Sequence, residues 1–139
     1  MTAVMATFAE VAVEAESGRV SVTRVVQAFD CGAVVNPDHL KLQLEGAVVQ
    51  GLGGALFEAV HFENGRILNP HMASYRVPRF SDAPSVEIIL VDRKDLPSAG
   101  AGETGIVGIA PALGNAICDA TGLRLRSLPM APDGLHRPA

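Results

Sequence analysis

Cysteine is scarce in this chain of 139 residues, and its two cysteines, Cys31 and Cys118, stand far apart. Neither belongs to a C-x-x-C pair or to a Cys/His spacing of the kind that holds zinc or an iron–sulfur cluster. We therefore expect a buried free thiol at each position and no metal ion bound by the protein's own side chains.

Basic residues are also few, since 11 Lys and Arg stand against 15 Asp and Glu, for a net charge of −4. They form no cluster, and Arg124 with Arg126 is too small a pair to make a phosphate-binding stripe. Nucleic acid and anionic membrane are therefore not expected partners. No apolar run reaches the ~18 residues of a membrane span. Residues 1–9 lack the regions of a signal peptide, and no cellular location is assigned.

The chain nevertheless has what a folded domain needs. It is 48% hydrophobic and only 19% charged, which excludes a disordered tail. Its length fits one domain with a modest core. We predict one folded unit over residues 1–128, followed by a loose tail over residues 129–139.

Alternation of apolar and polar residues predicts strands in two regions. The period is two on both sides of Ser17-Gly18, which is typical of a turn, so we expect an antiparallel hairpin over residues 7–29. Its polar face is expected to meet water or another part of a larger protein. Residues 85–91 are mostly apolar and β-branched, which predicts a further strand.

Between these strands the period changes to that of a helix. Asn36 suits an N-cap and Pro37 the first helical position, so we predict a long central helix over residues 37–60. On one face Gln43, Gly46, Gln50 and Gly53 recur at spacings of three and four residues. Each helical glycine costs about 1 kcal/mol relative to alanine. Close packing of another helix on this face would explain the glycines without any ligand.

The remaining segments complete an α+β pattern. Asn64-Gly65 predicts a tight hairpin turn, and residues 69–78 are too proline-rich for a regular helix or a central strand. A second helix is expected near residues 110–121, with a stop at Gly122. Residues 123–128 are expected to form a short edge strand.

One carboxylate, Glu103, lies in a loop of small residues between the last predicted strand and the second helix. Glycines at 100, 102 and 105 allow the backbone to come close to a bulky ligand. Glu103 could project into a cleft while nearby N–H groups face an anion or a polar cofactor. Alternatively, its charge lies near a helix N-terminus and simply favours the helix dipole, a role without chemistry.

Several motifs occur in a fixed order along the chain. They are Asp30-Cys31-Gly32, Asn36-Pro37, Gln43-Leu44-Glu45-Gly46-Ala47, Gln50-Gly51-Leu52-Gly53, Gly100-Ala101-Gly102-Glu103-Thr104-Gly105 and Ala110-Pro111-Ala112-Leu113-Gly114-Asn115. Together they resemble the C-terminal part of the molybdenum-cofactor-binding subunit of the xanthine dehydrogenase/aldehyde oxidase family. The resemblance is closest to the isoquinoline 1-oxidoreductase and bacterial aldehyde dehydrogenase branch, and it extends from about Thr7 to Met130.

The resemblance implies an α+β molybdenum-cofactor-binding domain and assigns roles to residues. Glu103 corresponds to the catalytic base, and Gln43 to a glutamine that hydrogen-bonds the pterin. Gly46, Gly102 and Thr104 are expected to contact the cofactor, a molybdopterin in its dinucleotide form that carries molybdenum. Thr104 stands where many members have proline. The implied reaction is hydroxylation of an aldehyde or an N-heterocycle with oxygen from water.

The resemblance covers only the end of a subunit that is several times longer. It therefore implies a partner chain with the rest of the molybdenum subunit, an iron–sulfur subunit carrying 2Fe-2S clusters, and a small-molecule substrate. A truncated or non-catalytic domain that keeps the fold without the reaction is the alternative. A generic anion-binding module on the helix after Glu103 is a third possibility.

Overall fold

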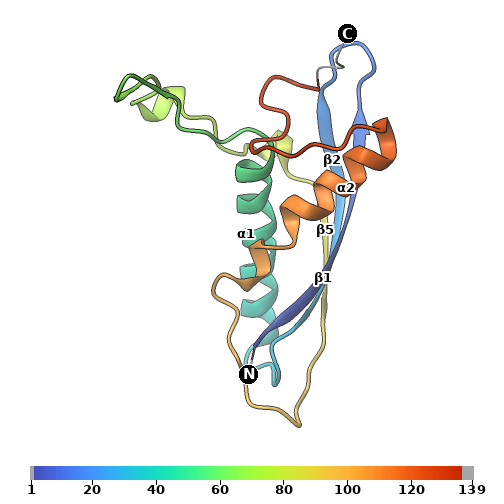
Figure 1. The fold of residues 1–139 in the computed structure, drawn as a ribbon. Coiled ribbons are helices and arrows are strands. Elements are labelled where there is room, and N and C mark those ends of the chain that lie inside the picture. The colour runs from blue at the N-terminus through green and yellow to red at the C-terminus, as the bar shows by residue number, and fades with distance from the viewer. Residues whose placement is uncertain (1, 136–139) are drawn as a thin grey trace.

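The computed structural model describes residues 2–135, in which a three-stranded sheet carries two helices on one face (Figure 1). Strands β1 (Val4–Val13) and β2 (Val20–Asp30) form an antiparallel hairpin. Strand β5 (Ser85–Leu90) lies parallel to β2 on its other side, so the order is β1-β2-β5. The predicted hairpin and strand are confirmed, although the hairpin begins at Val4 rather than near residue 7.

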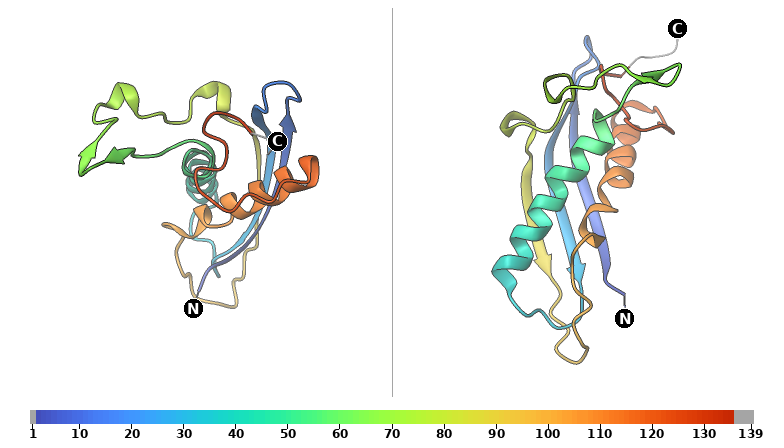
Figure 2. Two further views of the ribbon diagram at one scale, coloured as in Figure 1. Left: turned by 45° about the horizontal axis from the view of Figure 1, so that its top comes forward. Right: turned by 90° about the vertical axis from the view of Figure 1, so that its left-hand side faces the viewer.

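The core lies between the sheet and the helices. The inward residues Val25 and Phe29 of the central strand are 1% exposed, as the two-residue period requires. They meet fully buried side chains from both helices. Figure 2 shows both helices on the same side of the sheet, with the opposite side uncovered.

The long helix α1 (Pro37–Leu56) starts where it was predicted to start but ends earlier. Asn36 accepts a hydrogen bond from the His39 N–H at 3.0 Å, which confirms the N-cap. The expected end near residue 60 is wrong. Phe57 leaves the helical conformation, and the N–H groups of Phe57 and Glu58 both donate to the Gly53 carbonyl, which closes the helix.

Residues 58–82, here called the arm, lead away from the body after α1 and return to it before β5, where Arg76 lies over the Phe57 ring (Figures 1 and 2). The predicted hairpin is present as β3 (Phe62–Glu63) and β4 (Arg66–Ile67), around a turn in which Asn64 and Gly65 have φ of 49° and 77°. Two short 3₁₀ turns follow, η1 (Met72–Ser74) and η2 (Phe80–Asp82). The predicted lack of regular structure over residues 69–78 therefore holds except for η1.

The second helix α2 (Ile109–Thr121) follows a 3₁₀ turn, η3 (Thr104–Ile106), and is confirmed within one residue at each end. Gly122, in the left-handed conformation, ends it by donating its N–H to the Cys118 carbonyl. The edge strand expected over residues 123–128 is wrong. This segment runs over the helices, where no strand is available for pairing (Figure 1).

Residues 129–135, expected to belong to a loose tail, are fixed to the body. The N–H groups of Met130 and Ala131 donate to the carbonyls of Ala55 and Leu56 at 2.7 and 3.1 Å, and the Leu135 N–H donates to Gly18 at 2.8 Å. This segment therefore covers the end of α1. Residues 136–139 lie outside the described residues, and the boundary at residue 128 stays a prediction.

Candidate functional site

The structure brings Gln43 and the Glu103 loop together. Gln43 is in the second turn of α1, and its Nε2 donates to the Gly102 carbonyl at 2.7 Å across 59 positions of sequence. Both residues are exposed at this contact. Two motifs that are far apart in the chain therefore meet at the surface. The region around Gln43, Gly46, Gly102, Glu103 and Thr104 is called the corner below.

Glu103 itself is exposed and stands at the cap position of the η3 turn. Its carbonyl accepts the Ile106 N–H at 3.1 Å, while its side chain makes no capping hydrogen bond. The helix α2 begins six residues later and is capped by Gly108. The interpretation in which the charge of Glu103 favours the first turn of a long helix is therefore not supported. Its carboxylate is left free to face a ligand.

The glycines around this corner fall into two groups. A Cβ at Gly46 or Gly102 would meet no heavy atom of the described residues within 4 Å, so both positions leave open space beside Gln43 and Glu103. At Gly51, in contrast, a Cβ would lie 2.8 Å from the Cβ of Ile109. Close helix packing, offered as the explanation for Gly46 and Gly53 in the stripe, is therefore wrong among the described residues: Gly46 is open, and a Cβ at Gly53 would meet the side chains of Glu58 and Pro78 rather than another helix. Helix packing instead explains Gly51, which lies outside the stripe.

Thr104 is the first residue of η3 and is half-buried, in contrast to its exposed neighbours Gly102 and Glu103. Its carbonyl accepts the Val107 N–H at 3.4 Å, which closes the turn. Gly105 is buried, and a Cβ there would come within 2.8 Å of Leu44 on α1. The η3 turn, which directly follows the exposed carboxylate of Glu103, therefore packs against α1.

The loop that leads to Glu103 is fixed by the end of β2. The Ala99 N–H donates to the Cys31 carbonyl at 2.7 Å, and the Ala33 N–H donates to the Leu96 carbonyl at 3.1 Å. Burial raises the pKa of the Cys31 thiol, and nearby Asp30 acts in the same direction, so this cysteine stays a neutral packing residue.

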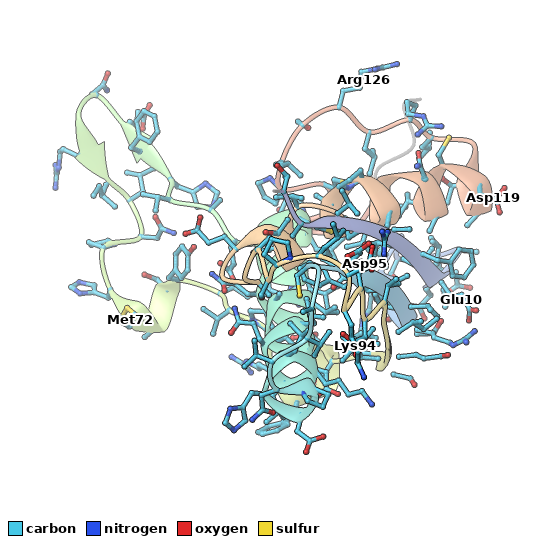
Figure 3. All side chains as sticks on the ribbon, turned by 90° about the horizontal axis from the view of Figure 1, so that it is seen from below. Glu10, Met72, Lys94, Asp95, Asp119 and Arg126 are labelled. Carbon is cyan, nitrogen blue, oxygen red and sulfur yellow. The ribbon has the colours of Figure 1, made fainter. Side chains whose placement is uncertain are left out.

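A charge pair shapes the far end of the same loop. The guanidinium of Arg93 donates two hydrogen bonds to Asp95, at 2.7 and 3.0 Å, and this holds the pKa of the Asp95 carboxyl below its ordinary value. Figure 3 shows Asp95 and Lys94 on the loop, with Met72 apart from them on the arm. Asp95 is thus paired with Arg93 at an exposed turn at the start of this loop.

The motif-based prediction omits one residue that lies directly under this corner. Gln27 is fully buried in β2, and its Nε2 donates to the Gly105 carbonyl at 2.8 Å. The signal in the sequence is a glutamine at an inward position between Val25 and Phe29, where an apolar residue is expected. Nothing local indicates its partner, which is 78 positions away.

Neither a metal-binding cluster nor a membrane-spanning helix accompanies the site in the described residues. Across residues 2–135, no group of at least three His, Cys, Asp and Glu side chains is placed to hold a metal ion. In the same part of the chain, none of the helices combines the length and the apolar character that crossing a membrane requires.

Comparison with protein families then gives a match over residues 1–84 to the molybdopterin cofactor-binding domain. The chain belongs to this family. The match covers the hairpin, α1 and the arm, so it includes Gln43 and Gly46 but ends before the Glu103 loop.

Similar proteins include molybdenum-binding subunits of oxidoreductases. The chain is 39% identical over 92% of its length to the beta subunit of isoquinoline 1-oxidoreductase from Brevundimonas diminuta. It is 38% identical over 90% of its length to a nicotinate dehydrogenase subunit from Pseudomonas putida, and 37% identical over 92% to the aldehyde oxidoreductase molybdenum-binding subunit of Escherichia coli. It spans only 16%, 10% and 18% of these proteins, respectively.

Solved structures agree with this placement. The aldehyde oxidoreductase from Desulfovibrio gigas has a similar fold over 94% of this chain and 15% of its own, with a TM-score of 0.81 and 29% identity. Quinoline 2-oxidoreductase from Pseudomonas putida 86 shares the fold over 88% of this chain and 16% of its own, with a TM-score of 0.78 and 23% identity. The predicted α+β molybdenum-cofactor-binding fold and the family resemblance are therefore confirmed.

Proposed function

We propose that this chain is the C-terminal part of a molybdenum hydroxylase that oxidises an aldehyde or an N-heterocycle, with Glu103 as its general base. The observation that carries the proposal is the hydrogen bond from Gln43 to the Gly102 carbonyl. It places the two residues with expected roles beside one another on an open surface. The similar proteins, whose names refer to isoquinoline, nicotinate and aldehydes, support both substrate classes.

The residues at this corner fit a bulky cofactor such as molybdopterin in its dinucleotide form. Gly46 and Gly102 leave space that a side chain would fill. Gln43 uses one amide N–H for the Gly102 carbonyl, so its Oε1 and second N–H remain for the donors and acceptors of a pterin edge. When bound, the cofactor supplies the molybdenum-dependent oxidation in which oxygen from water enters the substrate.

Glu103 contributes a proton acceptor in this proposal. Its carboxylate is exposed and does not cap its own turn, so its oxygens can accept a proton from a hydroxyl group held in front of it. A positioned base of this kind raises the rate by roughly 10²–10⁴-fold. The backbone on both sides is held by hydrogen bonds to the Gly102 and Gly105 carbonyls, which limits the movement of the carboxylate.

Two apolar surfaces support the proposal that this chain works inside a larger assembly. On the outer face of the sheet, Val4, Phe8 and Ile89 are 59%, 58% and 46% exposed. On the arm, Met72 and Phe80 are 84% and 104% exposed. Large apolar side chains this exposed are consistent with contact to another part of a larger protein. We propose that the rest of the molybdenum subunit covers them and that an iron–sulfur partner with 2Fe-2S clusters removes the electrons.

The experiment that tests the proposal compares the isolated chain with the complete assembly. Because the chain spans at most 18% of the similar proteins named above, we expect the isolated chain to retain little molybdenum. The assembly is expected to hold it near stoichiometrically and to oxidise an aldehyde or an N-heterocycle. Metal analysis and turnover measurements check both. An assembly that holds the metal but oxidises neither class would favour the non-catalytic alternative.

Gln43→Ala is expected to reduce cofactor retention in the assembly. The change removes an amide that donates to Gly102 and faces the open corner, and a lost hydrogen bond of this kind costs about 1 kcal/mol. Molybdenum content per protein is expected to fall several-fold, with turnover per remaining molybdenum changed less. Glu45→Ala, at another exposed position of the same helix, is the control. Equal metal content in both variants would contradict the assignment.

A further inference from the structure

Gln27 is the single buried polar side chain among residues 2–135, with no exposed surface. It lies in the central strand β2, opposite Thr7 of β1 and Ile88 of β5. Its neighbours on the inward face, Val25 and Phe29, are apolar and 1% exposed. An amide at such a position gives up its hydration, so its burial is unfavourable unless it forms hydrogen bonds inside the protein.

That partner is the turn after Glu103. The Nε2 of Gln27 donates to the Gly105 carbonyl at 2.8 Å and to the Thr7 hydroxyl oxygen at 3.1 Å. From the other side the turn meets α1, since a Cβ on Gly105 would be 2.8 Å from Leu44 and 3.2 Å from Ala47. The turn is therefore held between the sheet and α1, two residues after the carboxylate.

The donor and acceptor groups of the Gln27 amide are not equally satisfied. Both amide protons have acceptors, while its buried Oε1 has no partner among residues 2–135. An apolar side chain such as methionine would avoid this unpaired oxygen and would suit the surrounding core. The hydrogen bond to the Gly105 carbonyl therefore explains why an amide occupies this position, although burying the amide is costly.

We propose that Gln27 is a positioning residue that fixes the distance of the turn after Glu103 from the sheet. It works with Gln43, because the two amides hold the carbonyls of Gly102 and Gly105 and so bracket Glu103 on both sides. This inference rests on the proposed role of Glu103 as the base. A base must come within hydrogen-bond reach of the proton it takes, and a misplacement of about 1 Å can cost roughly 10²-fold in rate.

Gln27→Met in the complete enzyme tests the proposal. The change keeps the length of the side chain and removes the amide that donates to Gly105. We expect kcat per molybdenum to fall roughly 10- to 100-fold, with KM and molybdenum content unchanged. Amide hydrogen exchange in the same enzyme supplies a second readout. The Ile106 and Val107 amides, which close the turn, are expected to exchange about tenfold faster.

Thr7→Val is the matched control, because it removes a second acceptor of the same amide and leaves the Gly105 bond, and the weaker contact with the Met5 sulfur at 3.6 Å, in place. We expect kcat and exchange in the turn to stay near the wild-type values. If Thr7→Val and Gln27→Met lowered kcat equally, Gln27 would be serving general stability, and the proposal would be wrong.

Three outcomes separate this inference from the proposed function. If Glu103→Gln is inactive while Gln27→Met turns over at the wild-type rate per molybdenum, the positioning role is overturned and the base assignment stands. If Glu103→Gln keeps its rate, both are overturned. If Gln27→Met does not fold, Gly105→Ala displaces the same turn from the α1 side. Wild-type kcat in that variant would also overturn the proposal.

Discussion

Replacing Glu103 with glutamine is expected to lower turnover per molybdenum by roughly 10²–10⁴-fold, about 3–5 kcal/mol of activation free energy. Glutamine keeps the size of the side chain and much of its hydrogen bonding but cannot take a proton. Because Glu103 is exposed and its side chain does not cap the η3 turn, the change removes no observed structural contact. Folding and molybdenum content are therefore expected to stay at the wild-type level.

The measurement is turnover divided by molybdenum content in the complete enzyme, with aldehyde and N-heterocyclic substrates. Glu45→Gln is the matched control, since Glu45 is an exposed carboxylate on α1 that the proposed mechanism does not use. It should turn over at the wild-type rate. A wild-type rate per molybdenum in Glu103→Gln would show that another group takes the proton.

Gly51→Val is expected to destabilise the chain by about 1–3 kcal/mol, the usual cost of forcing extra atoms into a packed core. A Cβ at Gly51 would lie 2.8 Å from the Cβ of Ile109 and 2.9 Å from its Cγ1. Ile109 is fully buried at the start of α2 and cannot move away without shifting that helix. For a domain of this size, the midpoint of thermal unfolding should fall by roughly 4–12 °C.

Gly54→Val is the control, and we expect it to change the stability in the opposite direction. Gly54 is in the same helix, but it is exposed, and a Cβ there would meet nothing within 4 Å in the part of the chain that the structure describes. Helix propensity then dominates, and valine should stabilise by a few tenths of a kcal/mol. Thermal unfolding followed by circular dichroism compares the two variants. An increase in stability for both would mean that the α1–α2 contact is looser than the structure has it.

Much of the fold could be predicted because its signals are local. The two-residue period around Ser17-Gly18 is sufficient for the hairpin, and Asn36 with Pro37 is sufficient for the start of α1. Gly122 predicts the end of α2 in the same way. In each case the residues that make the signal also make the hydrogen bonds or bury the face concerned, so no distant partner is needed.

The errors lie where the ends or partners of an element depend on contacts that the residue pattern does not show. The end of α1 depends on the bonds of Phe57 and Glu58 to Gly53, and on the covering of its last carbonyls by Met130 and Ala131. An apolar period continued to residue 60 without any sign of these contacts. Residues 123–128 have a strand-like pattern but pass over helices, where no strand edge is available to them.

The candidate site shows the same contrast between local sequence signals and contacts made only in the folded chain. Motif order in the chain was enough to select Glu103 and Gln43, since residue types and spacing are visible there. Their contact through the Gly102 carbonyl, the open space at Gly46 and the buried amide of Gln27 come from packing. These features join positions 59 and 78 residues apart, and such contacts arise when α1 and η3 meet against β2. Periodicity cannot encode them, because it describes only neighbours along the chain.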